Sequence, residues 1–190
     1  MFDETQEKIM NAAMELIMEK GYGAATTKEI AVRAGVNECT LFRKFQGKKD
    51  IVLSAMTMPA WNPQLKESDF HWTGNLTEDL FSFSRIYMQK VTPRMVQVSI
   101  GLRSPELFEE TAPGILQIPM TYKNVLREYF AEMGEKGKLR SQDYEGMAVQ
   151  FLAMNFGFVF FKASFGDRLT ATEQEAYIRG SVERFICGIR

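Results

Sequence analysis

The sequence of 190 residues has only two cysteines and a single histidine. Cys39 and Cys187 lie far apart in the chain, and the N-terminus MFDETQEKIM lacks the basic start and apolar core of a secretory signal. We therefore expect a reduced, cytoplasmic protein without structural disulfides. The sequence also lacks an uninterrupted apolar run of about 18 residues, and MNFGFVFF at 154–161 is too short to span a membrane, so we expect no membrane association.

Catalytic and metal-binding motifs are missing as well. The chain has no G-x-S-x-G, H-E-x-x-H, P-loop or dinucleotide fingerprint, and one histidine leaves few general bases. His71 cannot form a metal site alone, because no carboxylate or thiol cluster accompanies it at ligand spacing. We expect no enzyme, metal or cofactor, and an enzyme with carboxylate chemistry is kept only as a third hypothesis.

The charge of the chain is nearly balanced overall but uneven along its length. The net charge is −1, with 45% hydrophobic residues, which is enough for one large domain or two small ones. Residues 26–49 hold six cations and two anions, a balance of +4, so the remainder carries −5. A local excess of this kind indicates a surface for a polyanion that the average conceals.

Capping residues, stopping glycines and a proline divide the first 60 residues into four predicted helices. Their limits are Asp3 to Gly21, Thr26 to Gly35, Asn37 to Phe45, and Lys48 to Pro59. Two short helices joined by a glycine-containing turn and braced by a longer helix form the helix-turn-helix arrangement. The second short helix is the one that such motifs place in the DNA major groove.

The stretch GVNECTLFRKF at 35–45 has the two faces that such a helix needs. At about 100° per residue, Leu41 and Phe45 share one face, while Cys39, Thr40 and Arg43 cluster opposite. The first face can anchor the helix and leave the second free for bases. The alternative is a three-helix cap on a larger helical protein with a solvated charged face, which we weigh below DNA binding.

The segment TTKEIAVRAGVNECTLFRKFQGKKDI resembles the DNA-binding segment of the tetracycline-repressor (TetR) family, and the match extends back to about Thr5. The matching positions are Ile30-Ala31, Ala34-Gly35-Val36, Thr40-Leu41-Phe42, Phe45 and Lys48. The resemblance implies an all-α protein with a three-helix DNA-binding head at 1–50 and a ligand-sensing, dimerising body at 51–190. Two positions depart from the family pattern, since Phe42 replaces a usual tyrosine and Cys39 a glycine or other small residue.

The same resemblance implies which residues meet an operator. Backbone contacts fall to Thr27, Lys28, Thr40 and Lys48, and base-edge contacts to Asn37, Cys39 and Arg43. Arg43 is the candidate for guanine, and the Phe42 ring packs on a sugar or a thymine methyl. Glu38 has two open roles, as acceptor from a cytosine amine or as a charge that stabilises its own helix end. Thr26 and Lys44 complete the expected DNA-binding set.

Beyond residue 59 the sequence predicts further helices with apolar stripes. Residues 59–74 are expected to be a linker with aromatic anchors, followed by a helix with Leu80, Phe83 and Tyr87 on one stripe. Prolines 105, 113 and 119 are expected to interrupt the chain before a long helix through residues 125–133. The last two helices are the most apolar and carry stripes around Phe151 and Phe185.

For this body the resemblance implies a small-molecule pocket and a dimer bundle. The expected pocket residues are Phe83, Tyr87, Met95, Met154 and Phe158, and the expected ligand is hydrophobic or amphipathic. The expected dimer interface comprises Phe151, Phe161, Ile178, Gly180, Ser181 and Phe185. The implied function is a repressor that binds a pseudo-palindromic double-stranded DNA operator as a homodimer and is released by its ligand. A helical protein that binds small molecules without regulating genes is the alternative.

Overall fold

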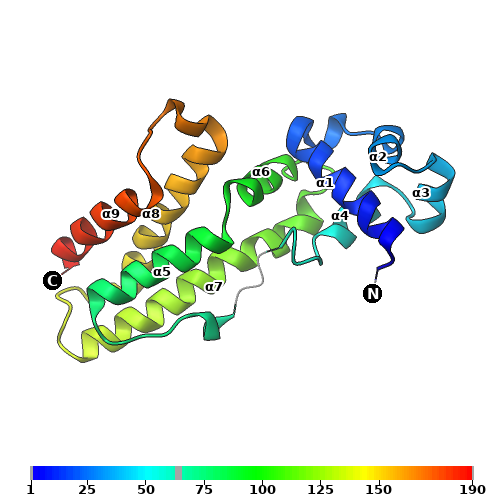
Figure 1. Ribbon diagram of the computed structural model, residues 1–190. Helices are drawn as coiled ribbons and strands as arrows, with labels where there is room; N and C mark the ends of the chain where they lie inside the picture. The colour runs from blue at the N-terminus through cyan, green and yellow to red at the C-terminus, as the bar shows by residue number, and fades with distance from the viewer. Residues whose placement is uncertain (1, 63–65, 190) are drawn as a thin grey trace. The chain divides into compact units, whose positions relative to one another are not determined.

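Figure 1 shows the computed structural model of the protein, which describes residues 2–62 and 66–189. These residues contain helices and no strands, which confirms the predicted all-α class. They form α1 (Glu4–Ala24), α2 (Thr27–Ala34), α3 (Glu38–Lys44), α4 (Lys48–Ala55), α5 (Leu76–Lys90), α6 (Pro93–Gly101), α7 (Phe108–Glu135), α8 (Tyr144–Phe165) and α9 (Gln174–Ile189). Single turns of 3-10 helix lie at Glu67–Asp69 and Gly166–Arg168.

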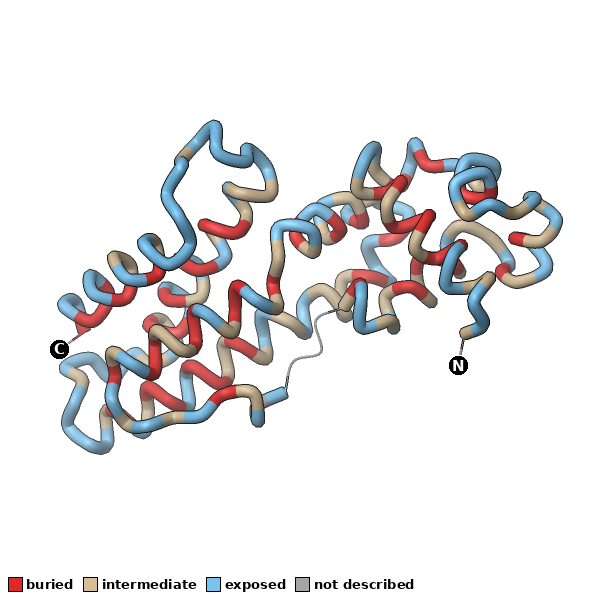
Figure 2. Tube along the Cα trace, in the orientation of Figure 1, coloured by how far each residue is buried: buried red, intermediate tan, exposed pale blue. Residues whose placement is uncertain are grey.

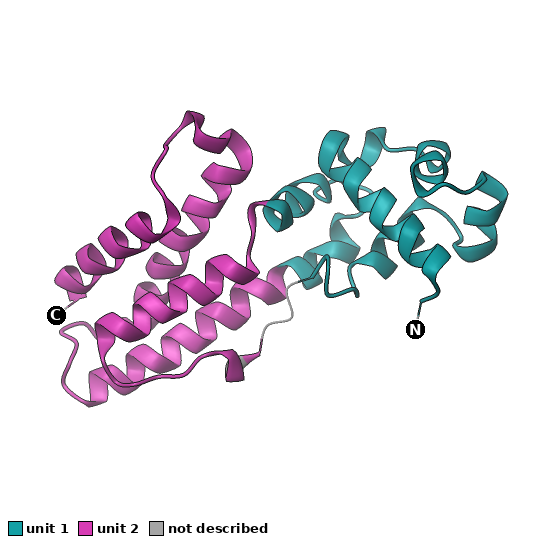
Figure 3. Cartoon of the chain, in the orientation of Figure 1, with its two compact units in different colours: residues 1–63, 94–115 teal, residues 64–93, 116–190 magenta. Residues whose placement is uncertain are grey.

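The chain divides into two compact units, coloured separately in Figure 3. The first comprises residues 1–63 and 94–115, and the second residues 64–93 and 116–190. The first unit is larger than the head expected at 1–50, because α4 and α6 also pack against α1. The helix α7 begins in the first unit and ends in the second.

The helix α1 is the centre of the first unit. An Asp3–Gln6 capping box starts it, and Gly21, with φ of 81°, interrupts its regular geometry near the predicted stop. Its buried residues, which Figure 2 shows in red, meet apolar side chains of α2, α3 and α4. The helix α6 approaches so closely that a Cβ at Gly101 would lie 2.7 Å from the main-chain oxygen of Ile17.

Aromatic side chains dominate the core of the second unit. The helix α5 packs against α8 and α9, and α7 adds rings from its C-terminal half. The rings of Phe83, Tyr122, Tyr129, Phe130 and Phe151 are at most 1% exposed. Such rings bury large apolar areas, so they contribute strongly to the packing of this unit.

The prediction that prolines interrupt the chain at 113 and 119 was wrong, because α7 contains both. An internal proline removes one main-chain hydrogen bond and costs about 3 kcal/mol, but it does not prevent helix on either side. The apolar face that α7 buries through Tyr122, Leu126 and Phe130 offsets that cost. In the linker, Trp61 and Phe70 are buried as the expected aromatic anchors, while residues 63–65 lie outside the described part.

The helix α8 is apolar on nearly every side. With the turn that follows it, from Tyr144 to Arg168, it is long and apolar enough to cross a membrane, by length and composition only, and about a third of its most apolar window is buried. Core helices of soluble proteins have the same properties. The large exposed apolar residues along it and the turn are Val149, Phe156, Phe161, Phe165 and Leu169.

Candidate nucleic-acid interface

Capping residues build the turn that joins α2 to α3. The hydroxyl of Thr26 accepts a hydrogen bond from the main-chain N of Glu29 at 3.3 Å, and Glu29 Oε2 accepts from the main-chain N of Thr26 at 3.1 Å. Gly35 ends α2 in the left-handed region, with φ of 69°. Asn37 then starts α3 by accepting from the main-chain N of Thr40 at 2.7 Å. These caps confirm the predicted limits of the two helices.

The short helix α3 is held from one side only. Leu41 and Phe45 are 0% and 4% exposed and anchor it in the core of the first unit. On the opposite side Cys39, Phe42 and Arg43 are exposed, with Phe42 at 52%. A large apolar ring exposed to this degree beside an arginine is a surface available to a partner, because neither group is used in packing.

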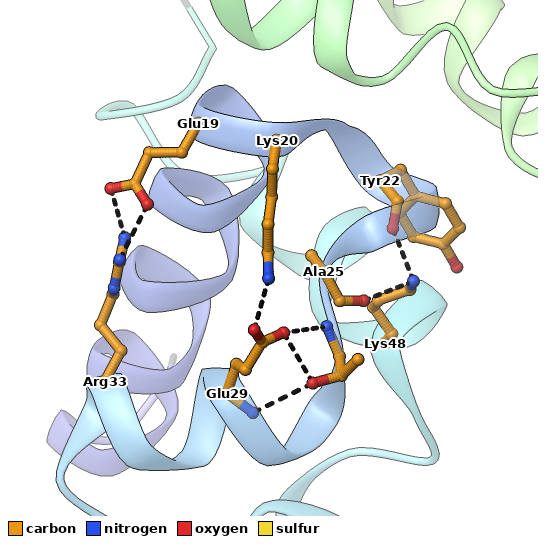
Figure 4. A network of polar contacts seen from close by, with 8 residues as sticks. Glu19, Lys20, Tyr22, Ala25, Glu29, Arg33 and Lys48 are labelled. Atoms are coloured by element: carbon orange, nitrogen blue, oxygen red, sulfur yellow. Dashed lines mark hydrogen bonds and ion pairs between the residues drawn. The ribbon is translucent and has the colours of Figure 1, made fainter.

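Two of the expected DNA-binding lysines already have partners within the first unit. The Nζ of Lys44 lies 2.6 Å from the carboxylate of Asp3. The Nζ of Lys48 donates to the main-chain oxygens of Tyr22 at 2.6 Å and Ala25 at 2.7 Å, as Figure 4 shows. Lys48 therefore closes the C-terminal end of α1, a role that the sequence did not reveal.

The remaining ion pairs consume more of the local positive charge. They join Lys20 to Glu29, Lys49 to Glu110, and Arg33 through both terminal nitrogens to Glu19. Of the six cations in residues 26–49, Lys28 and Arg43 are exposed and have no side-chain hydrogen bond or ion pair recorded in the described part of the chain. The structure thus separates two cations without such a partner from four that have partners within the first unit.

The carboxylate of Glu38 is also engaged. Glu38 Oε1 accepts a hydrogen bond from the hydroxyl of Thr27 at 2.7 Å, which links the first turn of α3 to the first turn of α2. Glu38 is partly buried and lies where a negative charge stabilises the start of a helix. This contact favours the structural one of the two roles considered for Glu38.

Two charged side chains near the start of α2, those of Glu29 and Lys48, have shifted pKa values. The ammonium of Lys20, followed by the hydrogen bonds from Thr26, lowers the pKa of Glu29 to about 2. Burial lowers the pKa of Lys48, whose Nζ also sits 4.0 Å from the centroid of the Tyr22 ring. Figure 4 shows both groups in one network that holds α1, α2 and α4 together.

The expected pocket residues belong to three helices, α5, α6 and α8. Phe83 and Tyr87 are buried neighbours in α5, with ring centroids 6.2 Å apart. In α8, Phe158 stacks on Tyr177 and Met154 is partly buried. Met95 belongs to α6 in the first unit. The sequence missed three rings that contact Phe83 or Tyr87, which are Phe70, Trp72 and Tyr122, and Tyr129, which stacks on Trp72. Residue spacing along single helices cannot reveal such a cluster, because its members come from three segments.

Three of the expected dimer residues need correction. Phe151, Ile178 and Phe185 are 0%, 1% and 8% exposed within a single chain, so they are core residues with almost no surface to offer a partner. Phe161 is 43% exposed, while Gly180 and Ser181 are partly exposed. For Phe151 and Phe161 the sequence could not separate core from surface because α8, which holds both, has apolar residues on all sides.

The described residues contain no group of three or more histidine, cysteine or acidic side chains able to hold a metal ion. Both cysteines are exposed and free. Cys39 stands on the outer face of α3, where the base-edge contacts were predicted.

Comparisons with known proteins agree with this architecture. Residues 9–55 match the model of bacterial regulatory proteins of the tetR family, and residues 80–188 match the C-terminal domain of AefR-like transcriptional repressors. The second match alone covers more than half of the chain. The protein therefore belongs to the TetR family of transcriptional regulators.

Individual relatives span nearly the whole chain. The uncharacterized HTH-type transcriptional regulator YvkB of Bacillus subtilis (strain 168) is 31% identical over 187 residues, covering 97% of both chains. Among solved structures, AibR in complex with isovaleryl coenzyme A and operator DNA has a TM-score of 0.69 at 22% identity, covering 95% of this chain and 97% of AibR. NalD, the secondary repressor of the MexAB-OprM multidrug efflux pump in Pseudomonas aeruginosa, has a TM-score of 0.68 at 16% identity, covering 98% and 96%. These two likenesses concern the fold.

Proposed function

We propose that this protein is a repressor that binds a pseudo-palindromic operator as a homodimer and releases it when a small molecule binds. The observation that carries the proposal is the outer face of α3, where Arg43, Phe42 and Cys39 are exposed while Leu41 and Phe45 are buried on the opposite side. A second helix of a helix-turn-helix with this geometry fits the major groove of DNA. Residues 1–50 would carry the DNA contacts, and residues 51–190 the sensing and dimerisation.

Arg43 and Lys28 are the principal proposed DNA contacts, because neither side chain forms a hydrogen bond or ion pair in the described part of the chain. Arg43 presents the planar donor pair that reads guanine, and Lys28 near the start of α2 would meet a phosphate. Asn37, Cys39, Thr40 and Phe42 would approach the DNA from α3 and its cap, and Thr26 and Thr27 from the start of α2. Lys44 and Lys48 would reach phosphates only by sharing or leaving the partners described above.

The exposed apolar residues of α8 support the homodimer. Phe156, Phe161 and Phe165 are 38%, 43% and 49% exposed on one helix. Large apolar side chains exposed to this degree are costly in water, and a second copy of the chain would remove those that it covers from solvent. Two copies would also supply the two recognition helices that a two-fold operator requires.

The ligand would act through the second unit. Small-molecule control requires a ligand that binds the two states of the dimer with different affinity, since equal affinity shifts nothing. AibR was crystallised with both an acyl coenzyme A and operator DNA, which supports the same division of labour here. The aromatic core around Phe83 and Tyr87 is the proposed location. The protein would act in the cytoplasm and without catalysis.

A selection experiment tests this function. The purified protein should retain a subset of duplexes from a random DNA pool, and the recovered sequences should share two inverted half-sites about 10 base pairs apart or a multiple of that. Affinity for the selected duplex should fall steeply with salt, because phosphate contacts release counterions. Recovery of no enriched sequence, or affinity independent of salt, would leave the non-regulatory binding protein as the better description.

A further inference from the structure

A buried hydroxyl in the second unit has no hydrogen-bond partner. Tyr122 of α7 is 0% exposed, and its hydroxyl is one of two buried side-chain groups without a partner among the described residues. Leaving a polar group buried and unpaired is unfavourable, so native proteins rarely do so without a functional reason. Burial, followed by the charges of Tyr87 and Asp69, raises the pKa of Tyr122, so the hydroxyl keeps its proton and can donate it.

The space in front of Tyr122 is filled by a ring from the linker before α5. The ring of Phe70 stacks on Phe83 at 5.1 Å and on Trp72 at 5.9 Å between centroids, and meets Tyr122 edge-on at 5.8 Å. Phe70 is 8% exposed although it belongs to a linker, not to one of the packed helices. It therefore occupies a cage of aromatic rings contributed by α5, α7 and its own segment.

The residue before Phe70 places a carboxylate beside the same cage. Asp69 forms an ion pair with Lys90, in which both side chains are about 30% exposed or less. Lys90 lies one turn after Tyr87 on α5, and the Tyr87 ring is 4.5 Å from that of Tyr122. The ion pair lowers the pKa of Asp69, so this carboxylate is ionised at neutral pH. Ring and carboxylate of two adjacent residues thus fill an aromatic cage and neutralise a cation at its edge.

We propose that Asp69–Phe70 is an internal stand-in for the effector, and that the effector is an aromatic monocarboxylate. Its ring replaces Phe70 between Phe83 and Tyr122, its carboxylate replaces Asp69 on Lys90, and the Tyr122 hydroxyl donates to it. The inference rests on the proposed ligand-sensing function and supplies the chemistry of the ligand.

Exchange of Asp69–Phe70 for the effector keeps two kinds of contact and adds one hydrogen bond. Ring stacking and the ion pair to Lys90 exist before and after it, whereas the hydrogen bond from Tyr122 forms only with the effector. The displaced segment stays attached, because Asp79 accepts hydrogen bonds from the main-chain N atoms of Thr73 at 2.8 Å and Gly74 at 2.9 Å. Asp79 is 1% exposed and also accepts from Tyr129, so this anchor is fixed. The C-terminal end of the displaced segment therefore stays in place at Thr73 and Gly74.

A fluorescence titration without DNA tests the site. Trp61 and Trp72 are the only tryptophans, so in a Trp61→Phe background the emission reports Trp72, which stacks on Tyr129 at 4.1 Å and lies beside Phe70. We expect 4-phenylbutyrate to change this emission saturably. The uncharged 4-phenylbutyramide and the ringless octanoate should each bind at least tenfold more weakly. Equal affinity of the amide would exclude the Lys90 pair, and equal affinity of octanoate would exclude the aromatic cage.

Three substitutions and a control locate the contacts. Lys90→Met should weaken 4-phenylbutyrate binding more than tenfold, and Tyr122→Phe about tenfold, the value of one hydrogen bond to a charged group. Asp69→Asn should strengthen it several-fold, because it removes the internal competitor. Lys123→Met is the matched control, since Lys123 is another partly buried lysine, paired with Glu145 in the same unit, and the variant should bind within twofold of the parent.

Equal effects of Lys90→Met and Lys123→Met, or unchanged binding in Asp69→Asn, would overturn the proposal. Asp69→Asn also decides the case if a core substitution prevents folding, because it removes only a partly exposed charge. Operator affinity measured with and without 4-phenylbutyrate distinguishes a failure of this binding site from a failure of the proposed sensing function. Binding through Lys90 and Tyr122 without any change in operator affinity would leave the site standing and remove the sensing function. Operator release by compounds that do not bind there would remove the site and keep the function.

Discussion

The hydroxyl of Thr27 donates a 2.7 Å hydrogen bond to the carboxylate of Glu38, so the first turns of α2 and α3 are tied to each other at the proposed DNA surface. The bond sets the position of one helix of the motif against the other. It also keeps a negative charge beside the unpaired cations Lys28 and Arg43. The carboxylate of Glu38 therefore has two opposing effects. It holds α2 and α3 in position for DNA, but its charge repels the phosphates of that DNA.

Glu38→Gln should separate those two effects. The amide oxygen can still accept from Thr27, so the geometry is kept while the repulsion of phosphates is removed. We expect binding to every duplex to tighten by about 1 kcal/mol, the scale of one charge pair at short range in water. Gel-shift titrations on the selected operator and on an unrelated duplex measure this. A loss of preference confined to one base pair would show instead that Glu38 reads a cytosine.

Arg43→Ala and Lys28→Ala should have different signatures. Loss of Arg43 should relax the preference at one base position and cost about 1 to 3 kcal/mol there. Loss of Lys28 should weaken all duplexes alike and reduce the salt slope by about one unit, because one phosphate contact is lost. Arg33→Ala is the control, since Glu19 already holds its guanidinium. If both variants matched this control at several salt concentrations, the assignment of α3 to the groove would be wrong.

Local features of the head could be predicted from the sequence because they depend on neighbouring residues. The capping box of Thr26 and Glu29, the stop at Gly35 and the cap at Asn37 each involve residues at most four positions apart. The partners of Lys44 and Lys48 could not be predicted in this way. Lys44 pairs with a residue 41 positions away, and Lys48 binds carbonyls 23 and 26 positions away, so tertiary packing decides which charges stay free.

The body was less predictable because α8 is apolar on several sides. Periodicity identifies an inner face only when the outer face is polar. In α8 it could not distinguish buried Phe151 and Phe158 from exposed Phe156 and Phe161. The aromatic cage around Phe70 depends on a linker that has no periodicity at all. Sequence patterns therefore predicted the class of the body but not its surfaces.

Glu29 should make the stability of the protein depend on pH in acid. Its pKa falls from 4.5 to about 2 in the folded protein, so its contribution is present above about pH 5 and is lost as the pH falls toward about 2. Glu29→Gln keeps the capping geometry without the charge. Thermal melts of both proteins should differ at pH 7 and converge as the pH falls through that window. A constant difference down to pH 2 would assign the effect to something other than this carboxylate.

Lys48→Met should act first on stability. The substitution leaves the main-chain oxygens of Tyr22 and Ala25 without their donor, and we expect a loss of about 1 kcal/mol at this partly exposed site, or a few degrees in melting temperature. The salt slope of operator binding should stay at the parental value if Lys48 remains on its carbonyls. A slope lower by one unit in a fully folded variant would show that Lys48 leaves them to contact a phosphate.

The exposed face of α8 leads to a prediction about assembly. Phe161→Glu places a charge on a ring that is 43% exposed, so the single chain should fold, but burial of that charge between two copies would be costly. We expect light scattering to report the mass of a monomer and operator affinity to fall sharply, because each half-site alone is bound weakly. Gly180→Trp tests α9 in the same assay, since the three atoms nearest to a Cβ added at Gly180 belong to the flexible end of Arg184. Ile100→Glu, an equally exposed position on α6, is the control and should remain dimeric. Dimeric mass and full operator affinity in both α8 and α9 variants would place the interface on another surface of the chain.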